Sequence, residues 1–108
     1  MKMDFLKLGA TGEVIITNYL TFGGNCHKTS EQKHNIQILQ VRSKDLIVQR
    51  EGIESPMYCQ LPKNSKDGSE TYWLTDDGNG FVRHYKSNFT DKRGLVENVT
   101  QTHYQFNA

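Results

Sequence analysis

The stretch VIITNYLTF, from Val14 to Phe22, combines β-branched and aromatic residues, with Gly12 before it and Gly23 and Gly24 after it. Residues of these types are enriched in strands, whereas glycine weakens a strand and marks its ends. The stretch therefore predicts a β-strand that ends in a turn. It sets the expectation of a β-rich protein.

Two further strands are expected directly after this one. Residues 36–41 and 46–48 are apolar runs joined by a short polar turn, which predicts a hairpin. The competing interpretation is a helix near residues 30–42, because Thr29 and Gln32 have the spacing of a capping box. The Ile and Val content of the run favours the hairpin, since β-branched residues are weak helix formers.

The second half of the chain also has strand and turn signals. Residues 57–61 lie between two prolines and can form only an edge strand, and residues 63–69 predict an exposed turn. Residues 70–74 and 80–86 flank an Asp-Gly step and predict a second hairpin. Residues 94–106 alternate between the two faces of a sheet, which predicts a long final strand.

These signals predict a mainly β fold, a small antiparallel barrel or sandwich of about seven short strands. The alternative is an α+β fold with one helix near residues 30–42. The chain has 108 residues, which suits a single globular domain over residues 1–108.

Composition limits the compartment and the partners. Thirteen basic and twelve acidic residues give a net charge of +1, so the charge of the whole molecule does not attract a polyanion. No apolar run reaches the roughly 18 residues of a membrane helix, and the N-terminus lacks the apolar core of a signal peptide. We therefore expect a cytoplasmic protein without a membrane partner. Cys26 and Cys59 could form one disulfide, but two free thiols are favoured.

The leading functional hypothesis concerns residues 23–35, where Cys26 is the only strongly apolar residue. Such a run predicts a long surface loop, and long loops are uncommon unless they bind something. The hypothesis is a small non-enzymatic binding protein, of the adaptor or inhibitor type, whose protein partner contacts this loop and a strand edge. The expected contact residues are Asn25, His27, Lys28, Glu31, Lys33 and His34.

A second hypothesis is binding of single-stranded nucleic acid by residues 83–93. Basic side chains alternate there with aromatic rings, as in grooves that hold phosphates and stack bases. The alternation could also send the rings into the core and leave the charges in solvent. The expected contact residues are Arg83, Tyr85, Lys86, Phe89, Lys92 and Arg93.

Enzymatic function is the third hypothesis and ranks below binding. His84 or His103 could act as a general acid or base with Glu97, since histidine titrates near neutral pH. The spacing of the cysteines and histidines matches no metal-binding motif, so neither a metal nor another cofactor is expected.

The C-terminal strand gives one more expectation. From Asn98 to Ala108 the chain has no charged residue, whereas edge strands usually carry charges or proline. Residues 95–106 therefore form either a central strand of the sheet or the interface of a homodimer.

Overall fold

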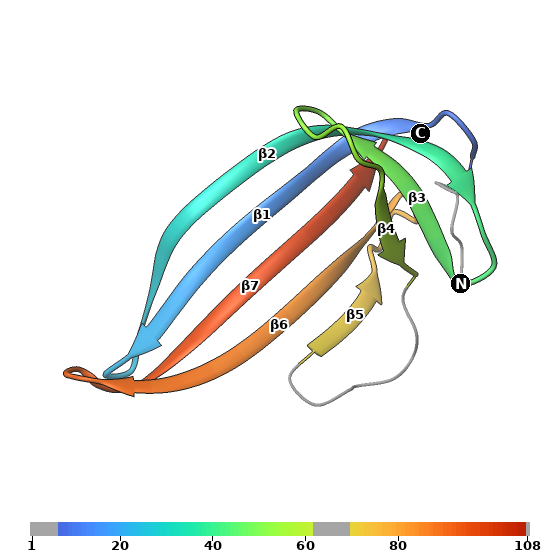
Figure 1. Ribbon diagram of the computed structural model, residues 1–108. Helices are drawn as coiled ribbons and strands as arrows, with labels where there is room; N and C mark the ends of the chain where they lie inside the picture. Colours follow the sequence, from blue (N-terminus) through green and yellow to red (C-terminus); the bar gives the residue numbers. More distant parts are fainter. Residues whose placement is uncertain (1–6, 62–69, 108) are drawn as a thin grey trace.

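The computed structural model describes residues 7–61 and 70–107, which form seven strands and no helix. The strands are β1 (Thr11–Phe22), β2 (Asn25–Val41), β3 (Asp45–Arg50), β4 (Met57–Gln60), β5 (Glu70–Leu74), β6 (Gly80–Asp91) and β7 (Gly94–Phe106). Neighbouring strands are antiparallel, in the order β4-β3-β2-β1-β7-β6-β5 (Figure 1). The mainly β prediction is confirmed, and the alternative of a helix near residues 30–42 is wrong.

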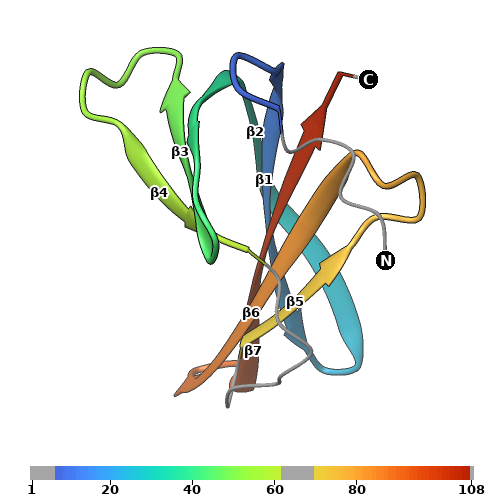
Figure 2. The same cartoon turned by 90° about the vertical axis from the view of Figure 1, so that its right-hand side faces the viewer.

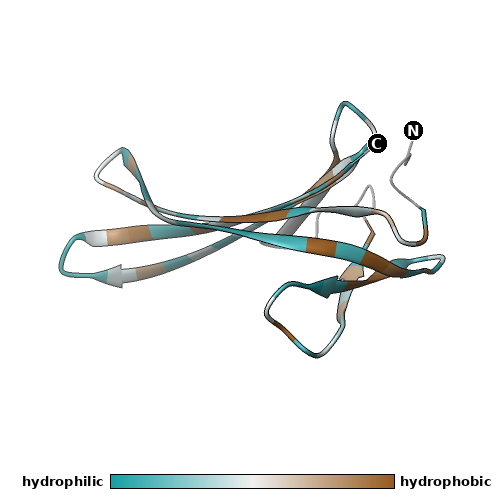
Figure 3. Ribbon diagram, turned by 90° about the horizontal axis from the view of Figure 1, so that it is seen from above, coloured by the Kyte–Doolittle hydropathy of each residue, from teal (hydrophilic) through white to brown (hydrophobic). Residues whose placement is uncertain are grey.

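The sheet curls into a half-barrel whose two end strands are β4 and β5 (Figure 2). The four long strands project away from this curled end as two neighbouring hairpins (Figure 3). We call this projecting part the blade and define it as residues 18–30 and 86–100. The hydrophobic colouring in Figure 3 is interrupted by hydrophilic segments along these strands.

The hydrophobic core lies inside the curled end. Phe81 and Tyr104, which oppose each other on β6 and β7, are buried with their ring centroids 4.6 Å apart. Val14 on β1 lies directly opposite Tyr104, and directly opposed residues share a face of the sheet. The face that carries these buried residues is the inner face of the sheet. The buried core residues are Val14, Ile36, Ile38, Leu46, Val48, Cys59, Leu61, Phe81, Tyr104 and Phe106.

The predicted loop over residues 23–35 is wrong, because β2 begins at Asn25. The connection is a two-residue turn of Gly23 and Gly24, with φ angles of 57° and 77°. Both central residues of a type I′ hairpin turn need positive φ, which glycine adopts without steric cost. The stretch is polar because β2 is exposed there, and hydrogen bonds to β1 rather than apolar burial hold it in the sheet.

Strand β7 is central, because β1 pairs with one of its edges and β6 with the other. A homodimer formed across residues 95–106 therefore has no free strand edge to use, which corrects that expectation. The predicted hairpins of β2 with β3 and of β5 with β6 are confirmed, and β4 is an edge strand. The turn expected at residues 63–69 falls outside the described residues.

Neither cysteine forms a disulfide: Cys26 is exposed, whereas Cys59 is buried in the core. Within residues 7–61 and 70–107 there is no helix of a length and hydrophobicity that would span a membrane.

Candidate binding site

The edge of the blade that β2 forms is open, and across the blade residues 86–91 of β6 also have β7 as their one neighbouring strand among the described residues. Strand β2 pairs with β1 along most of its length, but β3 joins its other side only from Ile36 onward. Among the described residues, positions 25–34 therefore have a strand on one side alone, as the lower part of β2 in Figure 1 shows. Unpaired peptide groups at a sheet edge are a template for another strand.

The hydrogen bonds identify which peptide groups of β2 point outward. Ile38 exchanges hydrogen bonds with the residues before β1, whereas the carbonyl oxygen of Asn35 accepts from Glu51 on the β3 side, at 2.9 Å. Alternate residues of a strand direct their peptide groups to opposite sides. Glu31 and Lys33 therefore direct their N–H and C=O groups to the open side.

The six predicted contact residues lie on this edge strand but not on one face. The register places Asn25, His27 and His34 on the inner face, and Lys28, Glu31 and Lys33 on the outer face. Thr29 is an extra residue of β2, a bulge opposite Asn18 and Tyr19. Because of this bulge, the inner face takes odd-numbered residues of β2 before Thr29 and even-numbered residues after it. The structure therefore places the predicted residues along one edge, from which side chains leave on both faces.

Several of these residues have partners within the chain. The His27 ring stacks on Phe22 with centroids 4.8 Å apart, and Lys28 Nζ lies 3.4 Å from Glu31 Oε1. His34 Nε2 lies 2.7 Å from a guanidinium nitrogen of Arg50, which holds the end of β3 against β2. These contacts order the side chains at both ends of the open edge.

A polar band crosses the inner face between the core and the tip of the blade. Asn18 lies at its centre, where its Nδ2 donates to Ser30 Oγ and its Oδ1 accepts from Thr100 Oγ1, both at 2.8 Å. Tyr85 opposes Thr100 from β6, and Arg83 opposes the neighbouring Thr102. We use the name inner band for Asn18, Ser30, Arg83, Tyr85, Thr100 and Thr102.

Two hollows adjoin the inner band. The first has a volume of about 260 Å³ and is lined by residues of β4, β5, β6 and β7. The second has a volume of about 180 Å³ and is lined by Arg83, Tyr85, Thr100 and Thr102. Arg83 lines both hollows, and its Cζ lies 5.7 Å from the centroid of the Tyr72 ring. The first hollow is lined by Tyr58, Cys59, Gln60, Tyr72, Phe81, Arg83 and Tyr104.

Two weak acids lie at the base of the first hollow. Burial raises the pKa of the Cys59 thiol, although a hydrogen bond with Tyr104 and the charge of Arg83 oppose this. Burial is also the main cause of the raised pKa of the Tyr104 hydroxyl, and the neighbouring Cys59 raises it further. Both groups are therefore neutral at physiological pH, and among the described residues lining this hollow Arg83 carries the charge.

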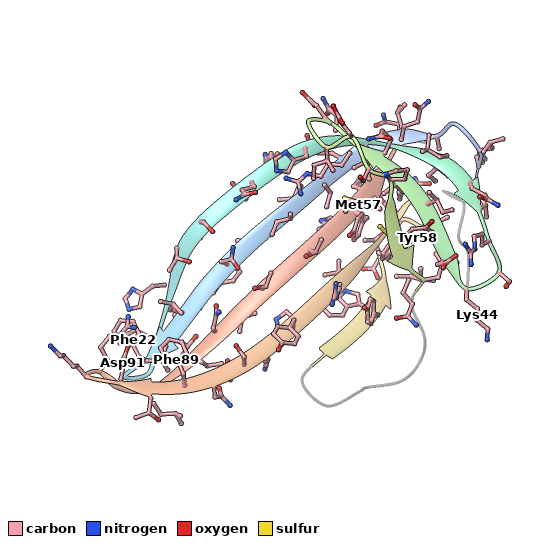
Figure 4. The ribbon with its side chains drawn as sticks, in the orientation of Figure 1. Phe22, Lys44, Met57, Tyr58, Phe89 and Asp91 are labelled. Carbon is pink, nitrogen blue, oxygen red and sulfur yellow. The ribbon has the colours of Figure 1, made fainter. Side chains whose placement is uncertain are left out.

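The tip of the blade holds a separate aromatic cluster, in which Figure 4 shows Phe22, Phe89 and Asp91 close together. Arg93 Cζ lies 4.8 Å above the centroid of the Phe22 ring, and Arg93 Nε donates to Asp91 Oδ2 at 3.0 Å. Hydrogen bonds from Arg93 lower the pKa of the Asp91 carboxyl. Val96 is buried at this end of the inner face.

The predicted nucleic-acid residues are divided by this arrangement. Arg83, Tyr85 and Phe89 lie on the inner face, whereas Lys86 opposes Val99 on the outer face. Lys92 and Arg93 lie in the turn between β6 and β7, where Arg93 is paired with Asp91. The six residues therefore do not form one continuous groove.

The outer face has its own hollow, of about 270 Å³. It brings together His84 and Glu97, two residues of the enzymatic hypothesis, whereas His103 is not among its lining residues. His103 Nε2 instead lies 3.0 Å from Gln105 Oε1. The lining residues are Tyr19, Thr21, Cys26, His84, Lys86, Glu97 and Val99. Acid–base catalysis by these histidines stays a prediction.

Comparisons with family models, with curated proteins and with solved structures yield no match for this chain. Within the described ranges, no three His, Cys, Asp or Glu side chains are grouped so that they could hold a metal ion.

Sequence reasoning did not identify most of the inner band. The alternation over residues 94–106 predicts that Thr100 and Thr102 share one face of the final strand, but nothing in the sequence indicates that Asn18 and Ser30 lie beside them. Pairs such as Asn18 and Thr100 are 82 positions apart, and only the order of the strands brings them together.

Proposed function

We propose that this chain is a non-enzymatic protein-binding module whose partner adds an extended segment to the open edge of β2. The observation that supports the proposal most directly is the edge at residues 25–34, which has β1 on one side only. In this mode of recognition, backbone hydrogen bonds supply affinity and alternate side chains supply specificity. Glu31 and Lys33 supply the outward-facing peptide groups.

The side chains along this edge favour a selective partner over general strand pairing. Lysines and bulges at sheet edges oppose indiscriminate association, and this edge has Lys28, Lys33 and a bulge at Thr29. A partner strand therefore has to meet a defined pattern of charge. Lys33 on the outer face favours an acidic residue directly opposite it.

A pair of variants at one position tests the proposal. Lys33→Pro removes the outward-facing N–H, whereas Lys33→Thr removes the charge and keeps the N–H. We expect affinity capture from nuclease-treated lysate to recover a partner with the wild type. The recovered amount should fall only slightly with Lys33→Thr, because a cross-strand charge pair contributes little, and at least about tenfold with Lys33→Pro. The tenfold decrease corresponds to the loss of one or more hydrogen bonds between the partner and the edge of β2.

Circular dichroism of each variant is the control for folding, because proline at an edge position leaves the hydrogen bonds between β2 and β1 in place. Equal recovery by Lys33→Pro and the wild type, or no captured protein with the wild type, would contradict the proposal. Material that the wild type captures only without nuclease would favour the single-stranded nucleic-acid alternative instead.

A further inference from the structure

We infer that the open edge of β2 also pairs with the same edge of a second copy of this chain, in one antiparallel register. The inference deepens the proposed function and rests on it, because both need the outward peptide groups of β2. Residues 25–34 have β1 on one side only among the described residues. Three features of this edge argue for a second copy: its length, the directions of its peptide groups and its charges.

The length of the open edge selects a register. Two identical edges related by a two-fold axis use the same residues on both chains. A register that places residue 25 opposite residue 34 of the second copy uses every open position of both edges. A register centred closer to β3 would run the second strand into it, because the carbonyl oxygen of Asn35 already accepts from Glu51 at 2.9 Å.

The peptide groups of β2 agree with this register. Asn25 closes the two-residue turn opposite Phe22, so its peptide groups point toward β1. By alternation, those of Lys28 point to the open side, as those of Glu31 do beyond the bulge at Thr29. The register places Lys28 opposite Glu31 of the second copy, so the two residues can exchange backbone hydrogen bonds. The two bulges lie opposite each other, and the spacing from Lys28 to Glu31 is therefore equal in both strands.

The charges of the outer face select the same register. Lys28 and Glu31 are exposed there, with Nζ of the lysine 3.4 Å from Oε1 of the glutamate within the chain. In the paired edges, each of them also lies opposite the other residue of the second copy, so the two-fold axis creates two cross-strand pairs of opposite charge. Shifting the register by two residues toward β3 would place Lys28 opposite Lys33 of the second copy. Like charges directly opposite each other are destabilising.

The pairing is expected to be weak. The contact consists of one short strand edge on each chain, and small interfaces are typical of transient association. We expect a dissociation constant on the order of 100 µM, so that chains at low micromolar concentration are single and present the edge to a partner strand. At higher concentration the second copy covers the same peptide groups.

The first test is sedimentation velocity of the purified full chain between about 5 µM and about 1 mM. We expect a dimer whose fraction rises with concentration. Amide hydrogen exchange of Glu31 and Lys33 should slow over the same range, because their N–H groups point to the open edge and become hydrogen-bonded.

Charge reversal tests the register. Lys28→Glu and Glu31→Lys each place like charges opposite each other twice, and each should weaken the dimer at least about tenfold. An equimolar mixture of the two variants should form a heterodimer at least as tight as the wild-type dimer, because an acidic edge then faces a basic one. Lys33→Glu is the matched control, since Lys33 lies opposite Cys26 of the second copy, and it should change the affinity less than about threefold. Circular dichroism of each variant reports whether the fold is retained.

Three results would overturn the inference: a chain that stays monomeric at about 1 mM, equal weakening by all three reversals without heterodimer formation, or oligomers that grow beyond a dimer. Growing oligomers would instead indicate pairing of β2 with residues 86–91 of β6.

The outcomes also separate the inference from the proposed function. A monomeric chain that captures a partner from lysate, with loss in Lys33→Pro, would overturn the inference alone. A dimer with the expected charge dependence supports the inference even where the lysate yields no partner, a result that would contradict the proposed function.

Discussion

At the scale of single residues, burial separates side chains that look alike in the sequence. Phe81 and Phe89 lie on the same face of β6, eight positions apart, yet Phe81 is 1% exposed and Phe89 is 41% exposed. Cys26 and Cys59 differ in the same way, since one is exposed and the other is buried. The curl of the sheet encloses one end of each long strand and leaves the other end open.

Phe81→Ala should lower the free energy of unfolding by about 3–5 kcal/mol, because the substitution leaves a cavity against the stacked Tyr104 ring. Phe89→Ala is the matched control on the same strand and face, and we expect it to cost about 1 kcal/mol or less. Urea denaturation of both variants measures the difference. An equal decrease in the free energy of unfolding in the two variants would contradict the placement of Phe81 in the core and of Phe89 outside it.

Cys59 and Tyr104 predict a loss of stability at alkaline pH. Burial raises the pKa of both groups in the folded protein, so they keep their protons while the unfolded chain loses them. These two groups should therefore leave the free energy of unfolding unchanged between pH 7 and about pH 8 and lower it as the pH rises further, by up to about 1.4 kcal/mol per pH unit for each group. Denaturation curves from pH 7 to about 10.5 measure this.

Tyr104→Phe should flatten this alkaline decline relative to the wild type, because the variant has no phenol to keep protonated. Tyr85→Phe, which changes an exposed tyrosine, should follow the wild-type profile. An unchanged decline in Tyr104→Phe would show that other groups cause it.

At the scale of elements, the sequence predicted most strands but not the longest one. β1, β6 and β7 have alternating or β-branched residues with glycine at a boundary, and β5 is followed by an Asp-Gly turn; these signals are local. The first ten residues of β2 have no such pattern. They are held by hydrogen bonds to β1, a strand that the chain reaches only through the turn at Gly23 and Gly24.

That turn gives a prediction for the hairpin of β1 and β2. Replacing Gly23 and Gly24 together with alanine should destabilise the protein by about 2–4 kcal/mol, because each position has positive φ. Gly23→Asn is the matched variant and should stay close to the wild type, since Asn-Gly is a favoured type I′ pair. Thermal unfolding measures both, and a stable double-alanine variant would contradict the turn geometry.

At the scale of the whole molecule, the core and the open surfaces lie at different ends. The apolar cluster occupies the curled end, whereas the aromatic tip belongs to the blade and the open edge of β2 runs from the blade tip to residue 34. A strand edge without a neighbour leaves its outward N–H groups in contact with water. The molecule is therefore expected to combine a stable end with a less protected one.

Amide hydrogen exchange tests this division. We expect Ile38, Val48 and Tyr104 at the curled end to exchange slowest, and Glu31 and Lys33 on the open edge to exchange fast. Gln32 lies between these two edge residues and should exchange more slowly than both, because its N–H points toward β1. Strong protection of Glu31 and Lys33 in the isolated chain would mean that the edge is already covered, for example by a second copy.

Local patterns along the chain are enough to predict that the protein is mainly β, where most turns lie and which residues of the final strand share a face, because these properties depend on neighbours within a few positions. The folded sheet was needed to show that residues 25–34 form an edge strand, that β7 is central, and that Asn18, Arg83 and Thr100 lie on the same face. Those outcomes depend on the order of strands and on the curl of the sheet. The order of the strands and the curl of the sheet result from contacts between residues far apart along the chain, and a local sequence pattern does not predict such contacts.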